Sequence, residues 1–155
     1  MIRTSTLFSA LVLPVLASAQ IVIDNTISPV DLVQNILLGQ GVTVSNIRFN
    51  GAVANTATEQ MGSFSGTCNV GIATGVVMGT GDVHAAEGPN DESGISQGTG
   101  SGYVDDDLAL ISPDAVNDVA VLEFDFVPTG DSLKFSFVFG SDEYPDFVCS
   151  QYNDV

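Results

Sequence analysis

Basic residues are almost missing from this chain. Its 155 residues include three lysines and arginines against 19 aspartates and glutamates, which gives a formal net charge of −16 at pH 7. Such a surface repels nucleic acid and anionic lipid, so we expect neither as a partner. Tryptophan is absent and His84 is the single histidine. A lone histidine is typical of a surface residue rather than of a zinc or general-base site.

Long hydrophobic runs are also missing, apart from one near the start. Residues 7–16 are apolar, but this run is too short to cross about 30 Å of hydrocarbon, and Pro14 interrupts it. Arg3 precedes the run and Ala17-Ser18-Ala19 follows it, a pattern typical of a signal peptide. We predict cleavage after Ala19, which leaves residues 20–155 as one domain without a transmembrane segment, secreted or at the cell surface.

Cysteine is scarce, with only Cys68 and Cys149 present. An even number in an exported chain predicts a disulfide, which would close a long loop and contribute about 4 kcal/mol in the chain-entropy model. Pairing of one of them with a cysteine beyond Val155 is the alternative. The sequence stops directly after a strand pattern, so we expect the domain to be incomplete at its C-terminal end.

The periodicity of apolar residues predicts a mostly β fold. Ser28 and Pro29 favour the start of one short N-terminal helix, and Gly39 favours its end. Residues 21–24 are interpreted as a short strand, and alternation predicts a strand at 42–49 and a hairpin that joins 120–126 to 133–139. Residues 84–107 are expected to form a surface loop. Because strands with one apolar face need a facing layer, we predict an antiparallel, jelly-roll-like β-sandwich.

Carboxylates are the only abundant reactive groups. Asp105 and Asp107 end the long polar segment, and Asp142 and Glu143 follow the last predicted strand. Calcium takes six to eight oxygen ligands from loops, so these four acids are candidate calcium ligands, with a solvated acidic face as the alternative. The glycine-rich stretches match neither a serine-hydrolase elbow nor a nucleotide-binding loop. We predict no catalytic residue and no other cofactor.

Two segments resemble a known family. Residues 117–128 and 135–148, including Phe-Gly-Ser-Asp-Glu-Tyr-Pro at 139–145, are similar to the choice-of-anchor L domain of secreted and surface proteins of bacteria, mainly Bacteroidetes. Pieces of residues 32–47, 71–90 and 107–108 agree with it. The resemblance implies an N-terminal position in proteins whose C-terminal end carries a sorting or anchoring signal. It brings no enzymatic activity, and it implies a further strand after 153–155.

Three hypotheses for function follow. The first is a non-catalytic extracellular module for adhesion, binding or display, with a glycan, matrix or surface protein as partner. The second is a secreted carboxylate-dependent hydrolase, for example one acting on glycans, which needs two acids within about 10 Å of each other in one cleft. The third is a structural spacer.

Overall fold

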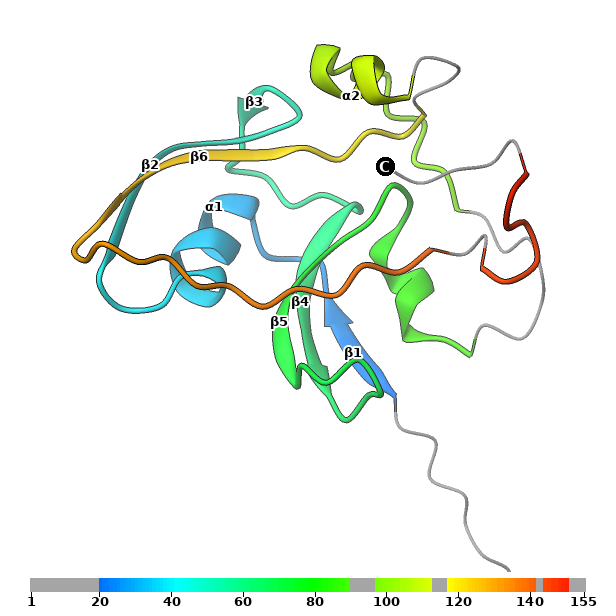
Figure 1. Ribbon diagram of the computed structural model, residues 1–155, viewed down its shortest axis with the longest axis horizontal. Coiled ribbons are helices and arrows are strands. Elements are labelled where there is room, and N and C mark those ends of the chain that lie inside the picture. Colours follow the sequence, from blue (N-terminus) through cyan, green and yellow to red (C-terminus); the bar gives the residue numbers. More distant parts are fainter. Residues whose placement is uncertain (1–19, 90–96, 113–116, 142–143, 151–155) are drawn as a thin grey trace, which may run out of the picture.

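The fold is mostly β, as predicted. A computed structural model describes residues 20–89, 97–112, 117–141 and 144–150. Two antiparallel three-stranded sheets, not closed into a barrel, make up the framework (Figure 1). The first has the order β1 (Ile21–Asp24), β4 (Met61–Gly66) and β5 (Thr74–Met78), and the second has the order β3 (Ala52–Val53), β2 (Val42–Phe49) and β6 (Leu122–Pro128).

The predicted N-terminal helix begins where the sequence indicates. Helix α1 (Pro29–Leu32) continues into a π-helical turn, η1 (Val33–Leu37). The Ser28 hydroxyl accepts a hydrogen bond from the Asp31 N–H at 3.2 Å and donates one to the Asp31 carboxylate at 2.7 Å. Pro29, which has no N–H to satisfy, occupies the first turn. The helix therefore starts at Pro29 because Ser28 provides the acceptor that the first turn requires.

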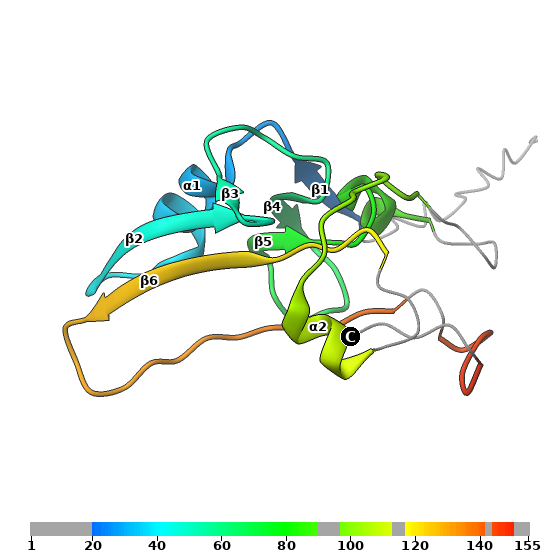
Figure 2. The same ribbon diagram turned by 90° about the horizontal axis from the view of Figure 1, so that it is seen from above.

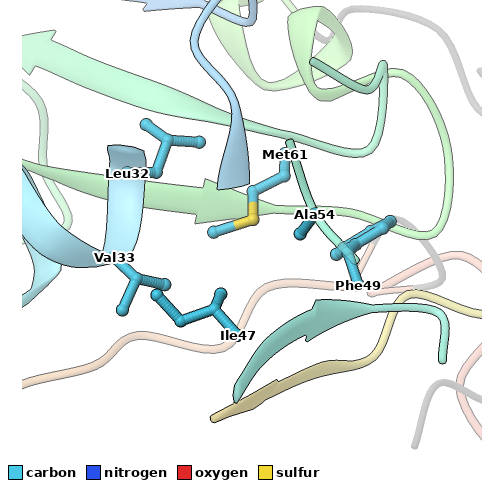
Figure 3. Packing of buried hydrophobic residues seen from close by; sticks show 6 residues of the cluster. All are labelled: Leu32, Val33, Ile47, Phe49, Ala54 and Met61. Atoms are coloured by element: carbon cyan, nitrogen blue, oxygen red, sulfur yellow. The ribbon is translucent and has the colours of Figure 1, made fainter. Parts of the chain in front are cut away.

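The two sheets and α1 share one hydrophobic core. This core receives side chains from the helical residues, from the second sheet and the segment after it, and from β4 of the first sheet (Figure 3). Its members are Leu32, Val33, Ile47, Phe49, Ala54 and Met61. Leu122 and Phe124 of β6 and Val76 of β5 pack against its rim. Full burial of such a side chain stabilises a fold by about 1.5–3 kcal/mol. Sharing of the core by both sheets gives the fold its sandwich-like character.

The predicted hairpin between 120–126 and 133–139 is not formed. Its first half is β6, which pairs with β2 over a register from Val42↔Pro128 to Phe49↔Leu122, with a shift between Ser45 and Arg48. Residues 131–140 are assigned to no strand and their side chains are exposed. They diverge from β6 in both views (Figures 1 and 2). Alternation in this segment correctly indicates an extended chain, but the partner that it implies is wrong.

Short helices lie at both ends of the polar stretch 84–107 that was expected to be a loop. Helix η2 (Val83–Glu87) is a 3-10 turn capped by Asp82, whose carboxylate accepts from the His84 N–H at 2.9 Å. Helix α2 (Asp106–Ile111) is capped by Asp105. Asp105 was expected to end a loop, but here it and Asp82 satisfy the free N–H groups at the starts of helices.

Candidate functional site

The acidic run at 105–107 has a structural role. An Asp105 carboxylate oxygen accepts hydrogen bonds from the N–H groups of Asp107 and Leu108, both at 3.0 Å. Asp106 and Asp107 lie in the first turn of α2, where the helix dipole favours negative charge. No group of three histidine, cysteine or acidic side chains is placed to hold a metal ion in the part of the chain that the structure describes. Asp142 and Glu143 lie outside the described residues, so convergence of the four acids stays a prediction.

Substitution of Asp105 separates its role as a helix cap from its predicted role as a calcium ligand. We expect Asp105→Ala to lower the free energy of unfolding by about 1 kcal/mol, because the cap is lost, and Asp105→Asn to stay near the wild type, because asparagine caps equally well. Urea denaturation measures both. Asp107→Ala, which removes only a first-turn charge, is the matched control.

Calcium titration completes this test. If Asp105 is a calcium ligand, calcium raises the melting temperature of the wild type, and Asp105→Asn loses that rise although its cap is intact. Calorimetry of the wild-type chain with calcium chloride, giving neither heat nor a rise in melting temperature, contradicts the calcium hypothesis.

The two cysteines are separate thiols in the structure. Cys68 is half-buried, and its thiol lies 3.6 Å from the carbonyl oxygen of Ile72, to which it donates. Cys149 is exposed and adopts a positive φ of 63°. The predicted bond between them is not formed in this arrangement. Oxidative pairing of Cys68 with Cys149 stays a prediction.

An exposed apolar stretch is the most unusual surface feature. Residues 133–139, here called the aromatic segment, expose Phe135 and Phe137 by 75% and 76%. Their ring centroids lie 6.1 Å apart. Other large apolar side chains of the segment are also exposed, namely Leu133, Val138 and Phe139. Exposed apolar groups that are contiguous rather than scattered mark interaction surfaces in soluble proteins.

The backbone of the aromatic segment adds a second property. Residues 131–140 belong to neither sheet. Just before them, the N–H and the hydroxyl of Thr129 donate hydrogen bonds to the Gly41 carbonyl oxygen at 2.9 and 3.0 Å. An extended segment outside a sheet can accept a further strand. The segment therefore combines apolar side chains with a backbone suited to strand addition.

A comparison with protein families now gives these features a context. The model of the choice-of-anchor L domain matches residues 21–155, nearly the whole chain. The chain belongs to the choice-of-anchor L domain family. This confirms the resemblance and indicates a surface-associated module of a secreted or surface protein. No curated protein and no solved structure matches the chain.

Catalysis finds little support in this choice-of-anchor L domain, whose family is not a known enzyme family. The Thr26 hydroxyl and then the Thr26 N–H hold the pKa of Asp24 below its usual value. The Ile23 N–H and then His84 lower the pKa of Glu87. Both shifts favour the ionised carboxylate, whereas a general acid needs a raised pKa. These two groups therefore do not suit the acid role of a hydrolase.

Sequence reasoning missed two features of the choice-of-anchor L domain. It placed the aromatic segment inside a sandwich, because alternation is the same for a covered and an uncovered strand. It also did not predict the contact of Glu87 with Ile23, because these residues are 64 positions apart in the sequence. In the described ranges, no helix is long and apolar enough to cross a membrane.

Proposed function

We propose that this choice-of-anchor L domain is a non-catalytic extracellular module that binds a partner through its aromatic segment. The observation that carries the proposal is the exposure of Phe135 and Phe137 on an extended chain outside both sheets. Family membership supports a position at the cell surface, and the predicted signal peptide at residues 1–19 supports export. Adhesion or display is the use that fits these properties.

The segment favours a protein partner over a glycan. An added polypeptide strand would bind the backbone of residues 133–139 through main-chain hydrogen bonds, while its side chains would pack on the phenyl rings. The chain has no tryptophan, the side chain that best stacks a sugar. The negative charge of the domain favours a partner with a basic surface, whose association rate would fall as salt rises.

A double substitution tests this proposal. We expect Phe135→Ser with Phe137→Ser to weaken binding by about 30-fold or more, the effect of removing an interface hot spot worth about 2 kcal/mol. The double variant should keep its melting temperature, because both rings are exposed in the folded domain. Biolayer interferometry against immobilised fibronectin, collagen and a panel of glycans measures the binding.

The control is Leu110→Ser, which removes an equally exposed apolar side chain from α2. Its binding should match that of the wild type. Equal losses in the two variants, or unchanged binding in the double variant, would contradict the role of the aromatic segment. A spacer would bind nothing on the panel, and a hydrolase would release product from a glycan.

A further inference from the structure

Strand β1 is held on both of its sides, but by different means. On one side it pairs with β4, with Ile21 opposite Gly66 and Asp24 opposite Ser63. On the other side it contacts η2 rather than another strand (Figure 1). Ile23 of β1 and Val83 of η2 are both buried. The first described strand of the chain thus has a helix, not a strand, at its outer edge.

The polar contact at this outer edge is made by Glu87. One oxygen of its carboxylate accepts a hydrogen bond from the Ile23 N–H at 2.8 Å, and the other lies 3.3 Å from Nδ1 of His84. Nearby, the Gln20 side-chain amide donates to the Gly88 carbonyl at 3.4 Å. The Glu87 carboxylate occupies the place that a carbonyl of a neighbouring strand would take. A bond to an ionised acceptor is stronger than one between neutral groups.

We propose that Glu87 is a clamp that helps to keep β1 in its sheet, and that protonation of Glu87 loosens this strand. Chain ends fray unless they are tied down, and predicted cleavage after Ala19 would put β1 one residue from the new N-terminus. Loosening of β1 would raise the exposure of the β4 edge that β1 covers. The clamp is therefore an acid-sensitive control of a sheet edge.

Three other charged or titratable groups face this site. From η2 these are His84, paired with Glu87, and Asp82, which caps the helix. From β1 it is Asp24, whose carboxylate accepts hydrogen bonds from the hydroxyl and N–H of Thr26. The charge interaction with His84 also lowers the pKa of Asp24. The two additional acids have donors of their own. Glu87 is the only one of the four that joins η2 to the backbone of β1 among the described contacts.

The direction of the pH effect follows from the Glu87 pKa. The Ile23 N–H and His84 lower this pKa in the folded chain. The clamp therefore acts fully above the usual glutamate value of about 4.3 and is lost as the pH falls through the lower folded value. Asp24 shifts in the same direction, so its local turn also weakens in acid.

Hydrogen exchange detected by mass spectrometry tests the clamp on the full chain. At pH 7 we expect Glu87→Ala to raise exchange in a peptide covering residues 20–24 on the order of tenfold, as the loss of one charge-assisted hydrogen bond predicts. Exchange in β2 and β6 should stay unchanged. Glu59→Ala, which removes an exposed acid whose backbone carbonyl still binds Val83, is the matched control.

The acid series uses a milder variant. Glu87→Gln keeps an oxygen acceptor but cannot be protonated in this range, so it should show intermediate protection of β1. Between pH 5 and pH 3, protection relative to an unstructured peptide should fall in the wild type and change much less in Glu87→Gln. Equal exchange of β1 in all variants, or an equal acid response in wild type and Glu87→Gln, would overturn the proposal.

Discussion

Replacing Leu32 by alanine is expected to lower the free energy of unfolding by about 2–5 kcal/mol. Leu32 is 0% exposed and belongs to the core that α1 forms with both sheets. Its neighbours in this core include Ile47 of β2 and Met61 of β4. The substitution removes buried methyl groups and leaves a cavity that the surrounding strands can fill only in part. Urea denaturation followed by circular dichroism measures the change.

The same substitution at Leu110 provides the control. Leu110 also lies in a short helix, α2, but it is 83% exposed. We expect Leu110→Ala to change the free energy of unfolding by no more than about 0.5 kcal/mol. Helix propensity changes equally in the two variants, so their difference reports burial alone. A loss at Leu32 as small as that at Leu110 would show that α1 does not belong to the core.

Local signals explain why α1 and two strands could be predicted. The start of α1 depends on Ser28, Pro29 and Asp31, which are adjacent in sequence and satisfy one another without help from the rest of the chain. Strand β1 is a short run of mostly β-branched residues, and β2 largely alternates apolar and polar residues. Such features need only neighbouring residues. The sequence therefore placed these elements to within a residue or two.

Pairing and exposure could not be predicted in the same way. Alternation at 133–139 shows which side chains share a face, but not whether another layer covers that face. One edge of β6 pairs with β2, which lies about 80 residues earlier in the chain, and the segment that follows the turn does not pair with the other edge. The exposure of the aromatic segment thus emerged only from the three-dimensional arrangement.

The roles of the candidate acids could not be predicted from the sequence either. Asp105 has the right chemistry for a calcium ligand and the right chemistry for a helix cap. The choice depends on whether a helix follows it, and the short α2 has too few apolar residues at helical spacing to be recognised. The structural contact of Glu87 could not be predicted because the backbone N–H that it binds, that of Ile23, is distant in sequence.

Gln60 is the centre of a buried polar network that joins the two sheets. It is 3% exposed, and its side-chain amide donates to the carbonyl oxygens of Thr80 at 3.0 Å, Asp118 at 2.7 Å and Val119 at 3.3 Å. Its side-chain oxygen accepts from the Asn50 amide at 3.4 Å. Asn50 follows β2, and the carbonyls precede β6 or follow β5, so this one side chain connects segments from both sheets.

We expect Gln60→Leu to lower the free energy of unfolding by about 2–4 kcal/mol, because carbonyls lose their donor in a place that water reaches poorly. Leucine has a similar volume, so the loss reports missing hydrogen bonds rather than a cavity. Gln34→Leu, at an exposed position of η1, is the control and should be nearly neutral. Urea denaturation of both variants decides the matter, since equal stabilities would mean that the Gln60 network does not hold the sheets together.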